Sequence, residues 1–363
     1  MLVALLCEYG SLNGGEHSIL SLLPFLRERG VRFRVFAPLQ GAVAEAVAAL
    51  EIELVPFCVA DHSSLAKRRE RLAELLRKHR PTLLHANSLS MGRLAGPVAT
   101  ELPLSSIAHL RDIIRLNGTA IADLNRHRAL LAVSEATRNF HVAQGINAGR
   151  CTVLYNGVDL QRFRPAEPTG FLHRELGIPL DAPLLGVIGQ LGIRKGQDFL
   201  LDALCPVFAE RPNGHLIIVG QRWSGKDESV HYEKRLRTVA ATEPYRNHVH
   251  FLGVRQDIPE LLRELTLLVH PARQEPLGRV LLEAAASGLA VVASNVGGTV
   301  EIFGNDSARL FDVNDSATLR SIITQLLDSA ELRRRLGIAA RKRCENLFSA
   351  ERCAERMLAI YAE

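Results

Sequence analysis

Two glutamates eight positions apart give the clearest chemical signal in the sequence. Glu275 stands directly before Pro276, and Glu283 follows within the run RVLLEAAAS. Proline suits the first position of a helix, whereas the residue before it is held out of helical geometry. We therefore predict that a helix begins at Pro276 with Glu275 as its N-cap, so that the amides of residues 277–280 are free to bind an anion.

Glu283 lies in an apolar setting on the same segment. An ionised carboxylate is costly there unless a partner donates hydrogen bonds to it. The two adjacent hydroxyls of a ribose would satisfy both of its oxygens. Pairing with a neighbouring arginine, or capping of a loop, is the alternative interpretation, and this segment by itself leaves both open.

A second signal is the run GVIGQLGIRKG, which extends from Gly186 to Gly196 and delivers Arg194 and Lys195 after a glycine-rich turn. An apolar strand precedes the turn, and an amphipathic stretch follows it. In doubly wound folds the ligand site lies at the carboxyl ends of the strands. Two cations at that place suit a diphosphate leaving group, whose charge grows as its bond to the sugar breaks. An isolated Arg-Lys pair is more often ordinary surface charge.

Two weaker signals lie in the first part of the chain. Asn13, Gly14 and Gly15 follow an apolar strand and form a turn that can approach a ligand closely, ahead of a helix with free first-turn amides. His109 lies at the end of the strand candidate SSIAHL, and Arg111 follows this segment. A histidine at a strand end is usually structural, but this one would open toward the same crevice.

Nothing in the sequence indicates a metal or a bound cofactor. There is no D-x-D motif, no carboxylate pair of the kind that holds Mg²⁺ against phosphates, and no histidine cluster. The six cysteines are scattered without zinc spacing, which favours a reducing compartment over a disulfide framework. We therefore expect chemistry that needs neither a metal nor a cofactor.

The bulk composition narrows the class of protein. The chain has 363 residues, 47% of them apolar, which is enough for two domains with substantial cores. A net charge of +5 is too small to indicate a nucleic-acid partner. With no signal-peptide pattern and no long apolar run, we expect a cytoplasmic protein.

A basic stretch from Lys67 to Arg80 carries Leu72, Leu75 and Leu76 at helical spacing. A surface helix with a solvated basic face is the simpler interpretation. Helices of this kind also lie on membrane surfaces. The stretch therefore leaves open a peripheral contact with the inner face of the membrane.

Short apolar runs alternate with longer amphipathic stretches along the whole chain, which is typical of βα units around a parallel sheet. The strand candidates are 3–8, 33–38, 82–87, 105–110, 129–134 and 151–156 in the first half, and 184–189, 215–220, 249–253, 265–271 and 290–294 in the second. The Pro- and Gly-rich segment FRPAEPTG separates the halves. We predict an α/β protein with two doubly wound domains, 1–163 and 164–348, and a final helix in 349–363.

With these motifs the chain resembles the group 1 family of retaining glycosyltransferases over nearly its whole length. Four segments match that family's motifs in order. The G-G-x-E opening is matched by NGGEHSILSLLPFLRERG, and the N-G-V-D segment is matched by LYNGVDLQRFRP. The Arg-Lys loop is matched by GQLGIRKG, and the E-x7-E element is matched by EPLGRVLLEAAASGLAVVAS followed by NVGGTVE. The resemblance implies the GT-B fold, with two Rossmann-like domains facing each other across a cleft. The first domain would lie on the acceptor side, the second would bind a nucleotide sugar, and the final helix would return to the first domain.

The resemblance also implies roles for the charged residues. Glu283 corresponds to the carboxylate that binds the nucleotide ribose, and Glu275 to the one that orients the donor sugar. Arg194 and Lys195 resemble the clamp on the diphosphate. His109 resembles the histidine near the donor sugar.

Further donor contacts are implied by the same resemblance. Gly14 corresponds to the glycine that approaches the diphosphate from the first domain. The backbone amides around Gly278, Arg279 and Val280 would complete the diphosphate site. The segment GVRQ, with Gly253, Val254 and Arg255, corresponds to the loop that contacts the base, mostly through its backbone.

Two positions depart from the family pattern. Asn13 replaces the first glycine of the opening turn, which makes the backbone there less open. Leu277 replaces the phenylalanine that usually follows the first glutamate, which would alter packing beside the sugar. Neither change touches a charged residue.

The function that these patterns favour is metal-independent transfer of a hexose-like sugar from a nucleotide-diphosphate sugar to an acceptor hydroxyl, with retention of configuration. The acceptor could be a glycan, a lipid or a small molecule. A nucleotide-sugar epimerase is an alternative in a different reaction class, since Glu275 could move a proton on the sugar ring. A non-catalytic protein that binds nucleotide sugars is the third hypothesis.

Overall fold

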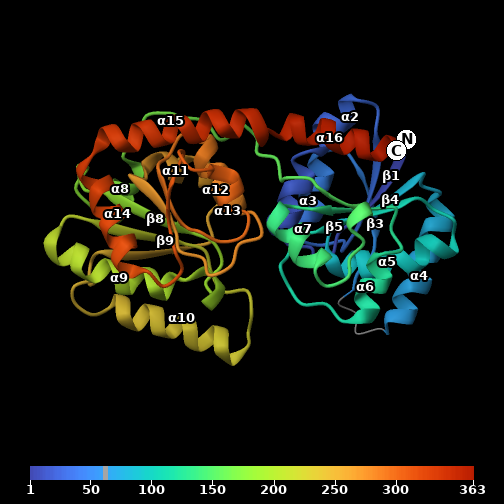
Figure 1. The fold of residues 1–363 in the computed structure, drawn as a ribbon, viewed down its shortest axis with the longest axis horizontal. Coiled ribbons are helices and arrows are strands. Elements are labelled where there is room, and N and C mark those ends of the chain that lie inside the picture. The colour runs from blue at the N-terminus through green and yellow to red at the C-terminus, as the bar shows by residue number, and fades with distance from the viewer. Residues whose placement is uncertain (60–63) are drawn as a thin grey trace. The chain divides into compact units, whose positions relative to one another are not determined.

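The computed structural model describes residues 1–59 and 64–363, and the chain divides into two compact units. The first unit consists of Met1–Gly157 together with Phe348–Glu363, and the second is Val158–Leu347. Each unit is built around its own parallel β-sheet (Figure 1). Among the described residues the first sheet has seven strands and the second has six.

The elements of the first unit follow one another in βα order. They are β1 (Leu2–Leu6), α1 (Gly14–Leu20), α2 (Leu23–Glu28), β2 (Arg32–Ala37), α3 (Ala42–Ala49), β3 (Glu53–Pro56), α4 (Leu65–His79), β4 (Leu83–Ala86), α5 (Leu89–Glu101), β5 (Ser106–Leu110), α6 (Gly118–Leu124), β6 (Ala129–Ala132), α7 (Glu135–Val142), β7 (Cys151–Val153) and, from the end of the chain, α16 (Ala350–Ala362).

The second unit repeats the alternation. Its elements are α8 (Phe171–Leu176), β8 (Leu184–Ile188), the short 3-10 helix η2 (Ile193–Lys195), α9 (Gln197–Glu210), β9 (His215–Val219), α10 (Asp227–Ala240), β10 (Val249–Gly253), α11 (Ile258–Glu264), β11 (Leu267–His270), α12 (Arg279–Ala286), β12 (Val291–Ser294), α13 (Thr299–Phe303), β13 (Arg309–Phe311), α14 (Ser316–Asp328) and α15 (Ala330–Leu347).

The strand order makes both sheets doubly wound, as predicted. It is β3-β2-β1-β4-β5-β6-β7 in the first sheet and β10-β9-β8-β11-β12-β13 in the second. In each sheet the direction of winding reverses at one place, between β1 and β4 and between β8 and β11. Ligands of such folds bind at the carboxyl ends of the strands beside that reversal, so the loops after β1, β4, β8 and β11 are where a site is expected.

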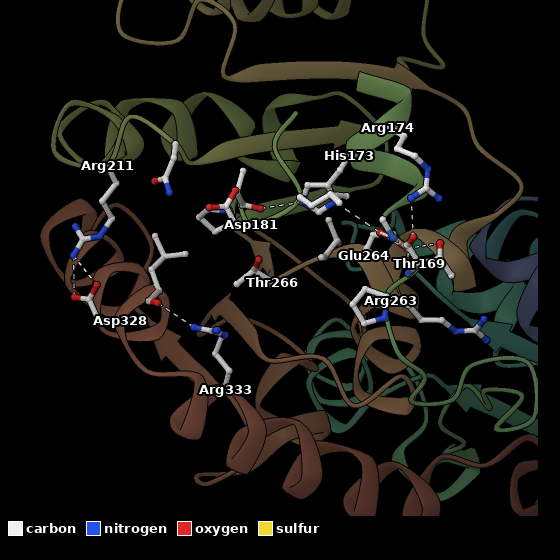
Figure 2. Close-up of a pocket in the computed structure, with 18 residues that line it drawn as sticks. Thr169, His173, Arg174, Asp181, Arg211, Arg263, Glu264, Thr266, Asp328 and Arg333 are labelled. Atoms are coloured by element: carbon white, nitrogen blue, oxygen red, sulfur yellow. Dashed lines mark hydrogen bonds and ion pairs between the residues drawn. The ribbon is translucent and has the colours of Figure 1, made fainter. Parts of the chain in front are cut away.

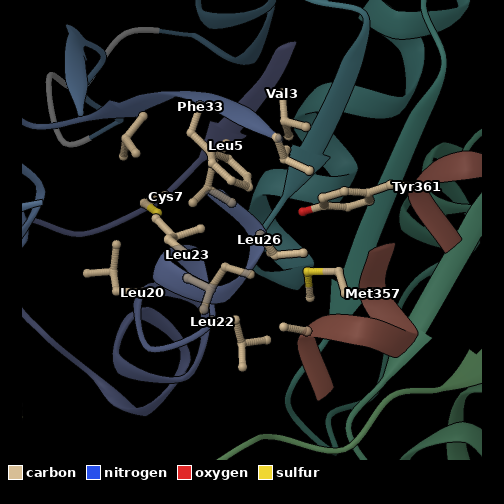
Figure 3. Close-up of a cluster of buried hydrophobic side chains, with 14 of the residues drawn as sticks. Val3, Leu5, Cys7, Leu20, Leu22, Leu23, Leu26, Phe33, Met357 and Tyr361 are labelled. Atoms are coloured by element: carbon tan, nitrogen blue, oxygen red, sulfur yellow. The ribbon is translucent and has the colours of Figure 1, made fainter. Parts of the chain in front are cut away.

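The first sheet is covered on both faces because its strands are apolar on both sides. Successive residues of β1 point to opposite faces: Val3 and Leu5 belong to one core cluster, and Ala4 and Leu6 to the other. The first of these cores includes side chains of α16, among them Met357 and Tyr361 (Figure 3). Helix α16 also packs against α2, so the last helix of the chain completes the core of the first unit.

Two strands escaped the sequence analysis, and both lie at sheet edges. β3 and β13 are the outermost strands of their sheets and are only partly buried. An edge strand covered on fewer sides does not need a continuous apolar run. The interior strands, which are buried, match the predicted ones.

The basic stretch forms α4, and its leucines face inward. Leu72, Leu75 and Leu76 are buried in the core of the first unit. This agrees with the simpler interpretation of a surface helix, because the apolar face that would insert into a lipid surface is already covered by the unit itself. Among the helices that the structure describes, none combines the length and apolar character needed to cross a bilayer.

The packing of α15 on α12 generates a prediction about stability. Gly337 lies within α15, and a Cβ atom added there would collide with the carbonyl oxygen of Gly288, just beyond α12. We expect Gly337→Ala to destabilise the second unit by about 1–3 kcal/mol although alanine favours helices, because the two helices would have to separate. Calorimetric unfolding measures this.

Gly118→Ala is the matched control, since Gly118 opens α6 and a Cβ there meets no atom within 4 Å. We expect it to be neutral or slightly stabilising. Equal losses in the two variants would contradict the close helix contact.

Candidate functional site

The loop after β8 brings two cations to the reversal point of the second sheet. Backbone conformations that favour glycine occur at Gly189 (φ 147°) and Gly196 (φ 69°), which bound the loop. Gly196 also packs so tightly on the carbonyl oxygen of Pro271 that a Cβ would not fit. The loop after β8 is thereby pressed against the loop after β11, and η2 presents Arg194 and Lys195 there.

Lys195 and Glu275 form a shielded ion pair between these two loops. Lys195 Nζ lies 2.6 Å from Glu275 Oε2, and the imidazole Nε2 of His270 lies 2.8 Å from the same oxygen. A carboxylate only accepts, so His270 carries its proton on Nε2 and donates it. Burial opposes ionisation of Glu275, but Lys195 and the hydrogen bond from His270 outweigh it and hold the pKa of Glu275 well below its ordinary value.

His270 is neutral at neutral pH. Its burial lowers its pKa, and the positive charges of Lys195 and Arg194 add to this effect against the opposing influence of Glu275. The cluster therefore contains one cation, one anion and one neutral donor. Arg194 is exposed and donates from Nη1 to the carbonyl oxygen of Gln274 at 3.1 Å, which leaves most of its donors for a ligand.

A second ion pair braces the same two loops. Arg273 binds Asp198 through both guanidinium Nη atoms, at 2.9 and 3.0 Å, and also donates to the carbonyl oxygen of Ile193 at 2.6 Å. Tyr232 on α10 donates to Asp198 at 2.9 Å. Bidentate pairs of this kind fix geometry as well as charge. Arg273 thus ties the loop after β11 to the start of α9 and holds η2 in place.

The helix after Glu275 begins later than the sequence suggested. The prediction of a start at Pro276 with Glu275 as N-cap is wrong: α12 begins at Arg279, after Gly278 with φ 96°. The reason is that Glu275 is held elsewhere, by its side-chain partners and by a 3.0 Å hydrogen bond from Gly298 N to its carbonyl oxygen. The first-turn amides without helical acceptors are consequently those of Arg279 and Val280 rather than those from 277 onward.

Glu283 pairs with an arginine on its own helix. Arg279 Nε donates to Glu283 Oε1 at 2.6 Å, one helical turn away. Pairing of Glu283 with a neighbouring arginine was the alternative to ribose binding. The contact occupies only one of the two carboxylate oxygens. Arg279 Nη1 is buried and has no hydrogen-bond partner among the described residues.

Arg255, in the segment expected to contact the base, has partners of its own. Arg255 is bound by two carboxylates, Glu175 at 2.6 and 3.1 Å and Asp257 at 2.7 and 2.9 Å. These hydrogen bonds raise its pKa, that from Asp257 most. Its guanidinium is thereby committed to structure, while Gly253 (φ 66°) and the exposed Val254 present backbone and an apolar surface.

In the first unit, the turn after β1 forms the start of α1. Asn13 is the N-cap and Gly14 the first helical residue. A Cβ at Gly14 would meet nothing within 4 Å, whereas one at Gly15 would lie 2.9 Å from Cδ of Arg111. Gly15, rather than Gly14, is therefore the glycine required by local packing.

His109 is the last residue but one of β5 and is buried beside a second histidine. Its Nδ1 lies 2.8 Å from Nε2 of His85 on β4 and 3.3 Å from Nη2 of Arg111. Arg111 is fixed in turn by both oxygens of Asn87 and by Asn156 Oδ1, at 2.7–2.9 Å. Burial, reinforced by the charge of Arg111, lowers the pKa of His109 well below its ordinary value, so the imidazole is neutral.

A separate hollow of about 870 Å³ lies at the opposite ends of the strands of the second sheet (Figure 2). Its lining includes Pro183 and Thr266, which directly precede β8 and β11, so it opens at the amino ends of these strands. There Glu264 accepts hydrogen bonds from Thr169 N at 2.7 Å and Gly170 N at 2.9 Å. These contacts hold the connector that enters the second unit, which is a structural role.

The structure thus joins some predicted site residues and separates others. In the second unit Lys195 meets Glu275, Arg194 binds the neighbouring loop, and Arg279 meets Glu283, whereas Arg255 is engaged elsewhere.

Sequence reasoning missed the residues that hold the site: His270, Arg273 and Asp198 in the second unit, and His85 and Asn87 in the first. His85, Asn87 and His270 stand at the ends of apolar strands, and polar residues at those positions were a usable signal. Among the residues described, no cluster of three or more His, Cys, Asp or Glu side chains is arranged to hold a metal ion.

Two family models match the chain in succession. The model described as Glycosyltransferase Family 4 matches residues 12–162, and that described as Glycosyl transferases group 1 matches residues 169–343. The second match contains the loops of Lys195 and Glu275, and the first contains Gly14 and His109. Together the two matches cover the elements of both sheets almost completely.

Curated relatives share about a third of the aligned residues. Spore coat protein SA of Bacillus subtilis is 33% identical over 219 residues, which is 57% of either chain. The GDP-mannose-dependent monoacylated alpha-(1-6)-phosphatidylinositol monomannoside mannosyltransferase of Corynebacterium glutamicum is 35% identical over 218 residues, 57% of this chain and 55% of that protein. The chain therefore spans little more than half the length of these relatives.

Solved structures match over the whole chain. HepE from Anabaena, solved in complex with UDP and glucose, has a TM-score of 0.88 at 24% identity and covers 99% of both chains. WaaG, a glycosyltransferase involved in lipopolysaccharide biosynthesis, has a TM-score of 0.74 at 19% identity, over 98% of this chain and 99% of that one. These likenesses confirm the predicted GT-B fold with its two Rossmann-like sheets.

The buried ion pair predicts a pH-dependent contribution to stability. We expect Glu275→Gln to lower the free energy of unfolding by about 2–4 kcal/mol at neutral pH, because Lys195 loses its partner in a shielded place. The folded pKa of Glu275 lies below its ordinary value of 4.5, so this contribution is complete above pH 4.5 and is lost as the pH falls below it. Urea unfolding of both proteins between pH 2 and pH 7 measures the difference.

Glu331→Gln is the control, because Glu331 pairs with Arg334 on an exposed helix face. It should change stability by less than about 1 kcal/mol at every pH. A loss for Glu275→Gln that persists unchanged at the acid end would contradict the assigned ionisation.

Proposed function

Because the chain belongs to the group 1 family of glycosyltransferases, we propose that it transfers a sugar from a nucleotide-diphosphate sugar to an acceptor hydroxyl with retention of configuration. The observation that carries this proposal is the Lys195–Glu275 pair at the reversal point between β8 and β11. It places a fixed cation and a fixed carboxylate side by side where doubly wound sheets bind ligands. A sugar diphosphate needs both, since its phosphates accept and its hydroxyls donate.

The diphosphate would be bound by positive groups without a metal ion. Arg194 has unused donors, Lys195 carries a full charge, and the first-turn amides of Arg279 and Val280 lie at the positive end of α12. When the bond to the sugar breaks, negative charge builds up on the phosphate oxygen. Donors that are already in position stabilise this charge without reorganising.

The two glutamates would bind the hydroxyls of the donor. Glu275 stays ionised and accepts from the sugar, while Lys195 and His270 hold it in one orientation. Glu283 would accept from the ribose hydroxyls. Its pairing with Arg279 is compatible with this role, because Oε2 makes no hydrogen bond among the described residues and the arginine fixes the carboxylate.

The remaining roles follow the family resemblance. We propose that the second unit binds the nucleotide sugar, with the backbone of Gly253 and Val254 near the base. The first unit would bind the acceptor, with Gly14 near the diphosphate and His109 near the donor sugar. Arg255 is assigned a structural part here, through Glu175 and Asp257.

The donor and acceptor can be narrowed by experiment. HepE was solved with UDP and glucose, and the Corynebacterium relative is GDP-mannose-dependent. UDP-glucose and GDP-mannose are therefore the first donors to test, by the rise in melting temperature that a ligand of the folded state produces. A glycan, a lipid or a small molecule remains the acceptor class, and a lipid acceptor would bring the chain to a membrane surface through contacts other than the buried leucines of α4.

Substitutions at two residues should separate binding from turnover. We expect Glu283→Ala to raise the dissociation constant of the nucleoside diphosphate about 10- to 100-fold, because hydrogen bonds to a charged acceptor are lost. We expect Lys195→Ala to lower kcat about 100- to 1000-fold with a smaller change in donor binding, because its charge acts most strongly on the leaving group. Calorimetric titration and initial rates measure the two effects.

Lys342→Ala and Glu331→Ala serve as controls, since both residues are exposed on α15. Normal binding and turnover in both site variants would reject the assigned roles. Incubation of the donor without acceptor tests the epimerase alternative, because an epimerase converts the sugar by itself. Donor binding without product over a broad acceptor panel would favour the non-catalytic alternative.

A further inference from the structure

A buried chain of polar side chains links the last helix of the protein to His109. Tyr361 on α16 places its hydroxyl 2.7 Å from Nδ1 of His85, and Nε2 of His85 lies 2.8 Å from Nδ1 of His109. All three side chains are 5% exposed or less. Figure 3 shows Tyr361 of α16 in the same buried cluster as Val3 and Leu5 of β1. The contacts all lie within the first unit.

The contact between Arg111 and His109 reveals the direction of the hydrogen bonds in this chain. A guanidinium only donates, and its Nη2 lies 3.3 Å from His109 Nδ1. His109 Nδ1 is therefore an acceptor, so His85 must donate to it from Nε2. A neutral imidazole with its proton on Nε2 accepts at Nδ1, and Tyr361 must then donate its hydroxyl proton to His85.

Each group in the chain has the protonation state that this direction requires. Burial lowers the pKa of His85 to about 3, and Arg111 contributes to the same effect. Burial raises the pKa of Tyr361 far above its ordinary value, so the phenol keeps its proton. The groups around the two imidazoles, Arg111 and the neutral phenol, donate and do not accept protons here, so neither ring becomes charged.

We propose that Tyr361 is a positioning residue for His109: acting through His85, it holds His109 in the tautomer that carries its proton on Nε2. That nitrogen makes no hydrogen bond with any residue the structure describes, so the fixed proton is available to an oxygen of the bound sugar. This inference rests on the proposed function, in which His109 contacts the donor. It extends that function by making the last turn of α16 part of the site.

The position of the hydroxyl is set by the packing of α16. Met357 and Ala354 are buried in the core of the first unit. Arg128 donates to the carbonyl oxygen of Ile360 at 2.8 Å, directly before Tyr361. A side chain held on both sides in this way loses little freedom when it makes one more hydrogen bond, and it can enforce one orientation on the next group.

The test compares Tyr361→Phe with the unmodified protein by nitrogen NMR of labelled histidine and by initial rates. In the unmodified protein, His109 Nδ1 should give the resonance of an unprotonated imidazole nitrogen and Nε2 that of a protonated one. In Tyr361→Phe, we expect the two resonances to move toward each other as the second tautomer becomes populated. We also expect kcat to fall about 3- to 10-fold with an unchanged KM for the donor, the scale of one net hydrogen bond.

Arg356→Met is the matched control, because Arg356 on the same helix donates to Val153 O at 3.1 Å and takes no part in the chain. It should leave the tautomer and the rates unchanged. His85→Gln retains a donor and an acceptor, and should keep more activity than His85→Leu. This comparison also holds if Tyr361→Phe is unstable.

Two outcomes would overturn the inference: a protonated Nδ1 on His109 in the unmodified protein, or unchanged resonances and kcat in a folded Tyr361→Phe. Failure of the proposed function would look different. The chain would then lack transferase activity, while the tautomer of His109 would still respond to Tyr361→Phe.

Discussion

The ion pair between Lys195 and Glu275 is the interaction on which the second unit's site depends. Two opposite charges from separate loops are removed from water, which costs free energy unless each is well partnered. His270 supplies a further donor to the carboxylate, and Arg273 with Asp198 keeps the two loops at the distance that the pair requires. These contacts are what keep the short loop after β8 in a position where Lys195 meets Glu275.

The same arrangement of strands serves different chemistry in the two units. At the reversal of the second sheet the structure places a carboxylate beside a cation, a combination suited to hydroxyls and phosphates together. One strand away from the reversal of the first sheet, at the end of β5, it places the neutral imidazole of His109 beside Arg111, which is held by Asn87 and Asn156. A neutral donor of this kind can bind a sugar oxygen without also attracting the negatively charged phosphates. The common fold explains where the groups lie, and the side chains at the strand ends explain what each unit contributes.

The sequence was informative where local physics decides the outcome. Interior strands were recognisable because both their faces are buried, and Arg194 and Lys195 could be placed because they follow a strand and a glycine turn. The edge strands β3 and β13 were not recognisable, since partial exposure relaxes the requirement for apolar residues. The start of α12 was predicted too early. The backbone of Glu275 is held by a hydrogen bond from Gly298, which lies far from it in the sequence. The roles of Arg273 and His85 in holding the sites were missed for a similar reason. The partners of these two side chains lie far away in the sequence, and no local pattern marks such contacts.

The presence of Tyr361, His85 and His109 in one core is difficult to explain by stability alone. Each polar atom taken from water must find a partner, and apolar side chains of similar volume would fill the space without that requirement. The chain instead devotes a phenol and two imidazoles to a series of hydrogen bonds that ends at a strand terminus beside Arg111. A series with one fixed direction transmits a defined orientation to its last member, and the last member here is the residue that faces the substrate in the proposed reaction. The need to orient His109 therefore accounts for this polar core more directly than a contribution to folding does.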